Sequence, residues 1–240
     1  MGYEQSRARV TASESHANGA TDKRAELTRR HILRAAAHQF AHRSYSQVSL
    51  DDILADAEVT KGAMYFHFRS KHALALALID EQTDTARAAA NQIVARRLSA
   101  LETLVDITYL VAVQDLGDEL ARAALNLIEG VGRADGVQGK LLGQWADSFA
   151  AFLQRAIHEG DVRADIQPAG SGRLLAALYM GLRQTSDLSD SETFLTDLQR
   201  SWLTLLPGLT PPDRVGYMTE FIKRRTALAL HTVPLRADTL

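Results

Sequence analysis

Three side chains in one short segment have the types and spacing needed to contact a nucleic acid. Thr60 offers a hydroxyl, Lys61 an ammonium and Tyr65 a phenol. Such groups bind phosphate oxygens and the edges of bases in a DNA groove. Gly62 and Ala63 lie between them and are small, so the backbone can approach a duplex closely. The segment therefore predicts a DNA-binding surface.

The residues around this segment predict two short helices joined by a tight turn. Ser49 can N-cap the first helix, with Asp52 three residues later as the acidic partner of a capping box. The turn follows at residues 57–59, and Thr60 can cap the second helix. Two helices joined in this way form a helix-turn-helix, whose second helix enters the major groove. Lys71 starts the next helix and can meet a phosphate. The DNA-binding candidates are therefore Ser49, Thr60, Lys61, Gly62, Ala63, Tyr65, His67 and Lys71.

The same segment resembles a known protein family. The sequence TKGAMYFHFRSK at residues 60–71, with RAELTRRHILRAAAHQF at 24–40, is similar to the DNA-binding region of TetR-family repressors. The likeness is greatest to the γ-butyrolactone receptor branch of actinomycetes, and it continues more weakly to about residue 229. Glu58 and Ser44 stand where family members often have glycine. A positive φ at either position would cost roughly 1 kcal/mol.

The resemblance implies an all-α protein with two domains. A three-helix helix-turn-helix DNA-binding domain is expected over residues 23–70, and a larger helical ligand-binding and dimerisation domain over 71–232. The implied function is a homodimeric repressor that binds a pseudo-palindromic operator and is released by a small butyrolactone, butenolide or furan. The dimer interface would be a four-helix contact made by the helices over 171–187 and 191–206. Two alternatives remain open, a ligand-independent repressor of this fold and one that senses another molecule such as an antibiotic.

Composition and charge are those of an ordinary globular protein. The chain has 240 residues, 46% hydrophobic and 23% charged, which is enough for a sizeable core. The absence of cysteine excludes disulfides and fits a cytoplasmic location, and the longest aliphatic run is too short to span a membrane. The net charge is −2, but residues 1–72 carry 11 Lys and Arg against 8 Asp and Glu. The basic excess therefore lies on the segment expected to face DNA.

No group of residues indicates an enzyme or a cofactor. The sequence offers no Ser/His/acid order, no metal cluster and no phosphate loop. The glycines over 130–136 follow a predicted helix and lack the spacing of a nucleotide loop, so they form a connector. His38 and His42 are four residues apart and could be a metal pair, but no third ligand is evident. We therefore interpret them as two exposed histidines and expect no metal.

Helical periodicity continues through most of the chain, and no period-2 run predicts a sheet. Residues 1–22 are polar and aperiodic, and we expect them to be disordered. Arg7 and Arg9 could form an arm in a minor groove, although a solvated tail is the preferred interpretation. Pro207-Gly208 and Pro211-Pro212 bracket a predicted turn before the last helix. The expected helices cover residues 24–41, 70–97, 99–114, 118–130, 137–160, 171–187, 191–206 and 213–230.

Three side chains of the second domain are candidates for binding a small ligand. Gln82 lies on the apolar face of its helix, where a polar group must find a hydrogen-bond partner, either in the core or on a ligand. Trp145 lies on a broad apolar face, and from the residues alone the core is the favoured position. Tryptophan can also form a rigid wall for a small ligand. The resemblance implies that both residues line the lactone pocket, and we add Tyr179 to this set.

Overall fold

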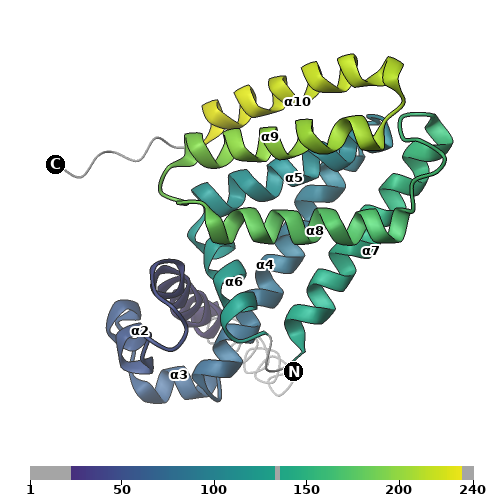
Figure 1. Cartoon of the computed structure of the whole chain (residues 1–240). Coiled ribbons are helices and arrows are strands. Elements are labelled where there is room, and N and C mark those ends of the chain that lie inside the picture. The colour runs from purple at the N-terminus through teal and green to yellow at the C-terminus, as the bar shows by residue number, and fades with distance from the viewer. Residues whose placement is uncertain (1–22, 133–135, 234–240) are drawn as a thin grey trace, which may run out of the picture.

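The computed structural model describes residues 23–132 and 136–233, and all regular secondary structure within these ranges is helical (Figure 1). This agrees with the expected all-α fold. None of the described helices is long and apolar enough to cross a membrane. Residues 1–22, with the proposed arginine arm, lie outside the described ranges. The first helix covers residues 23–42 and is followed by α2 (Leu50–Ala57), α3 (Lys61–His67), α4 (Lys71–Val94), α5 (Ala100–Gly117), α6 (Glu119–Gly130), α7 (Val137–Glu159), α8 (Pro168–Thr185), α9 (Ser191–Leu209) and α10 (Pro212–Thr232).

Local capping determines where the helices of the helix-turn-helix begin. The hydroxyl of Ser49 accepts a hydrogen bond from the backbone N–H of Asp52, whose carboxylate accepts one from the backbone N–H of Ser49. The hydroxyl of Thr60 accepts from the backbone N–H of Ala63 at the start of α3. Ser70 caps α4 in the same way. The bonds at Ser49 and Thr60 confirm the predicted caps, and each of the three bonds satisfies a backbone donor that the helix itself leaves free.

The turn between α2 and α3 places one non-glycine residue in the left-handed region. Glu58 has a φ of 52°, so the expected cost of roughly 1 kcal/mol applies there. Its backbone N–H still donates to the carbonyls of Ala55 and Leu54, which completes the end of α2. Ser44 has no positive φ. The expectation of strain is therefore confirmed at Glu58 and wrong at Ser44.

Two helices extend through a proline beyond their predicted ends. α8 begins at Pro168, whose missing N–H removes no hydrogen bond from the first turn of a helix. α9 continues through Pro207 and Gly208 and ends at Leu209, three residues beyond its predicted end, and the predicted turn lies between Leu209 and Pro212. Pro207 stands in the last turn, where at most one hydrogen bond of the helix is lost.

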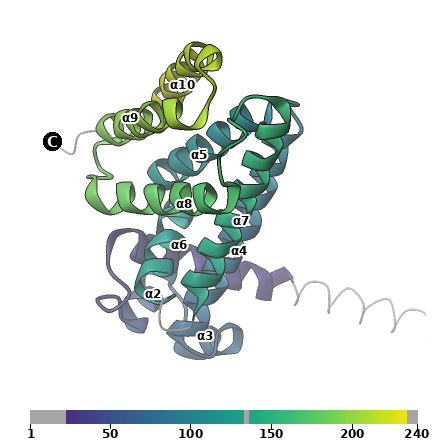
Figure 2. The same ribbon diagram turned by 45° about the vertical axis from the view of Figure 1, so that its right-hand side comes forward.

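The two ends of the molecule are formed by different parts of the chain. α2 and α3 lie at one end, and α9 and α10 lie at the other (Figure 1, Figure 2).

α5 packs between α4, α6, α7 and α10. The indole N–H of Trp202 on α9 donates to the hydroxyl of Thr108 on α5 over 3.0 Å. α7 and α8 pack closely because α8 carries Gly172, where a Cβ would lie 2.4 Å from the carbonyl oxygen of Ala146.

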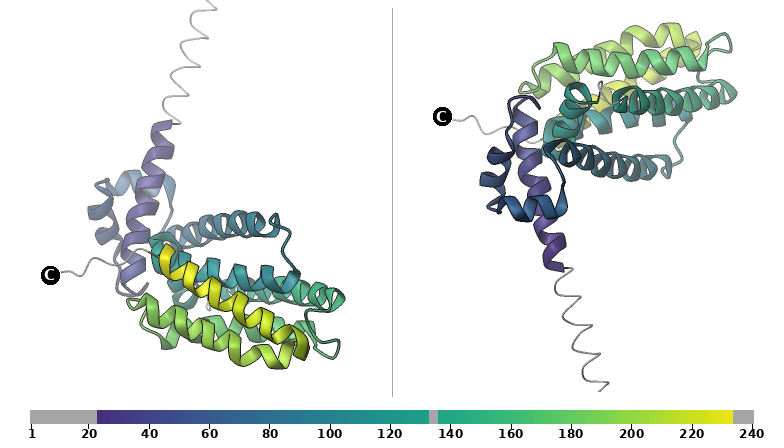
Figure 3. Two further views of the ribbon diagram at one scale, coloured as in Figure 1. Left: turned by 90° about the horizontal axis from the view of Figure 1, so that it is seen from above. Right: turned by 90° about the horizontal axis from the view of Figure 1, so that it is seen from below.

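The first three helices share their hydrophobic core with the next part of the chain. Ile32 of the first helix, Ile53 of α2 and Met64 of α3 belong to one buried cluster with Leu74 of α4. Residues of α6 also belong to this cluster, and the first helix lies across one end of the long helices of the second part (Figure 3). α4 and α6 therefore support the helix-turn-helix directly. Leu27, expected in the apolar stripe of the first helix, is instead 56% exposed.

Candidate ligand pocket and nucleic-acid interface

α3 lies at one end of the molecule (Figure 1), and its exposed side chains include Lys61, Tyr65 and Phe66. Lys61 and Gly62 are exposed, Ala63 is half-buried, and the side chain of Tyr65 is 47% exposed. Met64, on the opposite face, is fully buried and anchors the helix. Lys61, Gly62 and Tyr65 are therefore accessible on α3.

The remaining candidates of this surface already make contacts within the protein. The hydroxyls of Ser49 and Thr60 act as helix caps, but a hydroxyl that accepts a hydrogen bond can still donate its own proton to a phosphate. His67 is half-buried, and its ring makes an edge contact with Phe66 at 5.0 Å between centroids. Contact of these residues with DNA stays a prediction.

Phe66 is an exposed aromatic residue that the sequence interpretation overlooked. Its side chain is 78% exposed on α3, beside Tyr65. The helical period could have located it, because the buried Met64 and Phe68 are four residues apart and leave Phe66 on the opposite face. An exposed phenyl ring suits an apolar contact with the methyl group of thymine.

Lys71 points into the protein. Its ammonium donates to the backbone carbonyl oxygens of Tyr45 at 2.9 Å and Val48 at 2.8 Å, and lies 4.1 Å from the centre of the Tyr45 ring. Burial lowers the pKa of Lys71 below its ordinary value. The expected phosphate contact remains a prediction, but this lysine has a structural role that the sequence did not indicate. It joins the loop before α2 to the start of α4.

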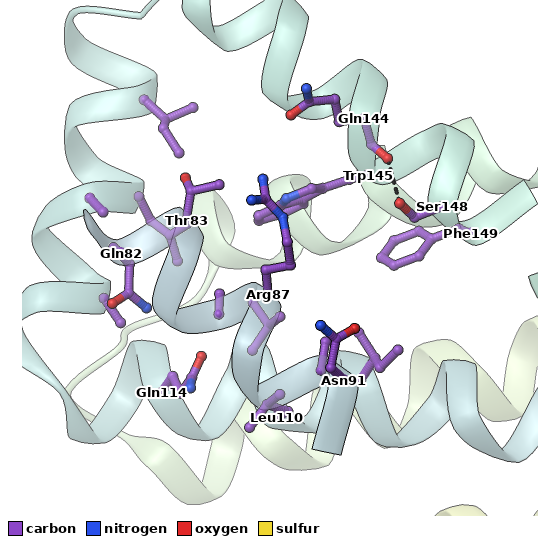
Figure 4. A pocket seen from close by; sticks show the side chains of 18 of the residues that line it. Gln82, Thr83, Arg87, Asn91, Leu110, Gln114, Gln144, Trp145, Ser148 and Phe149 are labelled. Atoms are coloured by element: carbon purple, nitrogen blue, oxygen red, sulfur yellow. Dashed lines mark hydrogen bonds between the residues drawn. The ribbon is translucent and has the colours of Figure 1, made fainter. Parts of the chain in front are cut away.

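A cavity of about 600 Å³ lies between α4, α5, α6 and α7 (Figure 4). Its volume falls within the range of roughly 300–1,000 Å³ that is usual for small-molecule pockets. The walls are mainly apolar, with a few amide, hydroxyl and guanidinium groups. The lining residues are Gln82, Thr83, Ala86, Arg87, Ala90, Asn91, Val94, Ile107, Leu110, Val111, Gln114, Ala121, Ala124, Leu125, Ile128, Gln144, Trp145, Asp147, Ser148, Phe149 and Phe152.

Gln82, which lines this cavity, carries a buried polar atom without a hydrogen-bond partner. Its side chain is buried, with 7% exposed, and no group of the described residues donates a hydrogen bond to its Oε1. A buried acceptor without a partner costs free energy, so Gln82 does not behave as a satisfied core residue. Gln82 is among the lining residues of the cavity (Figure 4), and its Oε1 is covered in this structure.

Trp145 lines the same cavity from α7, across from Gln82 (Figure 4). It is half-buried, whereas Trp202 is fully buried and its N–H is satisfied by Thr108. The two tryptophans of the chain therefore differ in position. Trp202 is a core residue, and Trp145 forms part of the cavity wall.

Tyr179, the third ligand candidate, is not among the cavity-lining residues. It lies behind Trp145, with 6.5 Å between ring centroids, and only 4% of its side chain is exposed. Its hydroxyl donates to a carboxylate oxygen of Asp115 over 3.4 Å, and burial raises its pKa well above the ordinary value. Tyr179 thus supports the wall made by Trp145.

The sequence interpretation missed most of the polar residues that line the cavity. Thr83, Arg87 and Asn91 lie along one face of α4, four residues apart, and Gln82 lies next to them. The helical period could have grouped these positions once Gln82 was chosen. The side chain of Arg87 is 63% exposed and pairs with Asp84 at 3.0 Å, which places its charge at the mouth of the cavity. The other polar lining residues come from α5 and α7, which sequence spacing could not bring together.

A buried polar network connects the ligand-binding part with the first helix. The guanidinium of Arg183 on α8 donates to Asp115 on α5 at 2.8 Å and to the amide oxygen of Asn126 on α6 at 2.7 Å. The Asn126 amide in turn donates to the backbone carbonyl oxygens of Phe40 at 2.9 Å and Ala41 at 3.3 Å. α6 therefore contacts the DNA-binding helices on one side and lines the cavity on the other.

The two histidines of the first helix are exposed, as the sequence predicted, but a third residue of ligating type that the sequence did not indicate lies beside them. Glu119, at the start of α6, lies within hydrogen-bonding distance of both His38 and His42. The three residues together form a group of metal-ligating type. Glu119 is 81 residues away from His38 in the sequence, so no local motif indicated it.

Comparison with known proteins places these features in one family. A family model described as "Bacterial regulatory proteins, tetR family" matches residues 32–78, which include α2, α3 and the start of α4. The A-factor receptor protein of Streptomyces griseus is 32% identical over 201 residues, which are 83% of this chain and 70% of that protein. The chain belongs to the TetR family of bacterial regulatory proteins.

Solved structures agree with this TetR-family assignment. A gamma-butyrolactone receptor described as an ArpA-like protein has a TM-score of 0.72 and 29% identity, over 85% of this chain and 98% of that chain. CprB of Streptomyces coelicolor, solved in complex with its biological operator sequence, has a TM-score of 0.73 and 29% identity, over 87% and 99% of the two chains. This TetR-family protein is thus a transcriptional regulator related to γ-butyrolactone receptors, and it is not an enzyme.

Proposed function

We propose that the protein is a homodimeric repressor that binds a pseudo-palindromic operator and leaves it when a γ-butyrolactone-like signal enters the cavity. A repressor of the same fold that is ligand-independent, or that senses an antibiotic, is the alternative. The observation that carries the proposal is the cavity of about 600 Å³, mainly apolar, with the unpaired oxygen of Gln82. Buried acceptors normally have a hydrogen-bond donor, and a ligand in the cavity could supply the donor that Gln82 lacks.

The chemistry of the cavity favours a small, mostly apolar molecule with at least one hydrogen-bond donor. The hydroxyl group of an alkyl-substituted lactone meets this requirement, since it can donate to Gln82 while the alkyl chain lies against Trp145 and Phe149. The related A-factor receptor and the gamma-butyrolactone receptor support this ligand class by their names. A strongly charged ligand is less suited, because Arg87 and Asp147 are the only charged groups among the lining residues and have opposite signs.

Two helices can carry the signal from the cavity to the DNA-binding helices. α4 carries Gln82 in the cavity and, about three turns earlier, Lys71, which holds the loop before α2. α6 lines the cavity and binds the first helix through Asn126. A ligand that favours a different position of either helix shifts the population toward a state with altered spacing of the recognition helices.

The proposed dimer uses the outer face of α8 and α9. Leu174, Leu178 and Leu182 follow each other at four-residue intervals on α8, and Leu174 is 54% exposed. α9 adds Leu205, which lines a shallow hollow with Leu178 and Leu182. Burial of such a stripe against a second copy is a main source of dimer stability. A two-fold dimer places two α3 helices in successive major grooves if they are about 34–36 Å apart.

The operator can be found by selecting bound fragments from a random DNA pool with the purified full-length protein. We expect a palindromic site, and we expect γ-butyrolactones but not antibiotics to release it. Release by an antibiotic alone, or by no compound, would favour one of the two alternatives. Failure to select any sequence would refute the proposal as a whole.

The variant Trp145→Ala separates a cavity wall from a core residue. Loss of the wall should weaken ligand binding by roughly 1–3 kcal/mol, while operator affinity without ligand stays close to wild type. A core role predicts that stability, operator binding and release are lost together. Met218→Ala, in the fully buried core on α10 and not among the cavity-lining residues, is the control, because it should lower the melting temperature without reducing ligand affinity.

A further inference from the structure

His38 and His42 lie one turn apart on the first helix, and both approach the same carboxylate of α6. His38 Nδ1 is 3.2 Å from each carboxylate oxygen of Glu119, and His42 Nε2 is 3.1 Å from Oε1. The three side chains lie between the DNA-binding helices and the ligand-binding part, apart from the cavity. Neither DNA binding nor ligand binding, as proposed above, requires two histidines around this carboxylate.

We propose that His38, His42 and Glu119 bind one zinc ion or a similar divalent transition metal, with water completing the coordination. Two imidazole nitrogens and one carboxylate oxygen are a known ligand set for zinc, which takes a fourth ligand from solvent in such open sites. Imidazole also suits cobalt, nickel and copper. Magnesium and calcium prefer oxygen ligands throughout, so we do not expect them to bind here.

The distances suit such an ion. In a tetrahedral zinc site with bonds near 2.0–2.1 Å, neighbouring ligand atoms lie roughly 3.3 Å apart. The nitrogen-to-oxygen distances of 3.1 and 3.2 Å already approach this value, and the ligand atoms of all three residues lie within 4.8 Å of one another. Rotation of the imidazole rings, whose centroids are 5.4 Å apart, can bring the two nitrogens closer. The side chains are 52%, 40% and 48% exposed, so an ion and its waters can reach them.

A second contact between the first helix and α6 lies close to these three residues. Asn126, two turns further along α6, binds the backbone of the first helix and keeps the two helices in register. A bound ion would add a second link between the same helices.

The alternative is that Glu119 only forms hydrogen bonds with the two histidines as part of the contact between helices. The two interpretations differ in metal binding, which can be measured on untagged full-length protein stripped of metal with a chelator. Zinc is titrated in competition with a chromophoric indicator, and cobalt is titrated separately and followed by its visible absorption. We expect one saturable equivalent per chain for each metal and no competition from magnesium or calcium.

Three variants locate the site. Glu119→Gln and His42→Ala should each weaken zinc binding by at least about tenfold, because even the loss of a group that only orients a ligand costs 10–100-fold. His31→Ala is the matched control, since His31 is exposed on the same helix but outside the group. It should leave zinc affinity unchanged. Unchanged affinity in both ligand variants, or equal loss in the control, would overturn the proposal.

A second measurement does not depend on how the variants fold. Zinc should raise the melting temperature of the wild-type protein, because an ion that binds only the folded state stabilises it. Amide hydrogen exchange should slow in two segments together, residues 38–42 and 119–126. Protection by zinc elsewhere in the chain, without these two segments, would contradict a site at this contact.

Discussion

Replacing Gln82 with methionine should have opposite effects on the stability of the free protein and on its affinity for ligand. Methionine has nearly the same length but lacks the amide. The variant therefore removes the buried Oε1 that has no donor among the described residues. It also removes the hydrogen bond that this oxygen would accept from a ligand. A satisfied core glutamine would behave differently, because its loss would only destabilise the protein.

The magnitudes follow from the position of this atom. A buried polar atom without a partner costs about 1–3 kcal/mol, and water in a cavity of this size can recover part of that cost. We therefore expect a gain of about 1 kcal/mol in the free energy of unfolding, or roughly 2–4 °C in Tm for a chain of this size. A lost hydrogen bond to ligand, about 0.5–1.5 kcal/mol, should weaken ligand binding roughly threefold to tenfold.

The assay combines thermal unfolding with operator release by a γ-butyrolactone. Gln92→Met is the matched control, because Gln92 is exposed on the same helix and does not line the cavity. It should leave both quantities near wild type. A Gln82→Met protein that loses more than about 1 kcal/mol of stability, with unchanged release, would refute the proposed contact of this oxygen with ligand.

Three further predictions concern DNA binding and assembly. Lys61→Ala should weaken binding to all DNA sequences similarly and reduce the salt dependence by roughly one unit of slope, in an assay repeated at several salt concentrations. Unchanged affinity and slope would contradict the proposed docking. Lys71→Met should lower the free energy of unfolding by about 1–3 kcal/mol, measured by denaturant titration, because the carbonyls of Tyr45 and Val48 lose their donor. A stable variant with only a reduced salt slope would instead support a phosphate contact. Sedimentation at micromolar concentration should show a dimer that Leu178→Glu converts to monomer, and a wild-type monomer with intact operator binding would exclude the α8 and α9 interface.

The helix-turn-helix could be predicted because its determinants are local. The caps at Ser49, Thr60 and Ser70 each involve a backbone N–H three residues further on, so residue type and spacing were sufficient. The left-handed conformation of Glu58 was indicated instead by the resemblance, because family members often have glycine at this position. Periodicity also placed Gln82 on an inward face of its helix.

Residues on different helices required the tertiary structure. Tyr179 was grouped with the cavity, but the packing of α8 behind α7 places it against Trp145 and Asp115 instead. Lys71 was expected at the surface, yet the fold of the preceding loop brings two carbonyl oxygens to its ammonium.

The clearest case is the contact between the first helix and α6. The sequence determined that His38 and His42 share one helix face, since residues four apart on a helix are neighbours. Only the tertiary structure decided that Glu119 lies beside them. Glu119 is 81 residues from His38 in the sequence, and it reaches the histidines because α4 and α6 pack with the first helix in one core. Caps and helix faces are determined within one or two turns of chain, whereas the distance between atoms on separate helices depends on how the whole core packs.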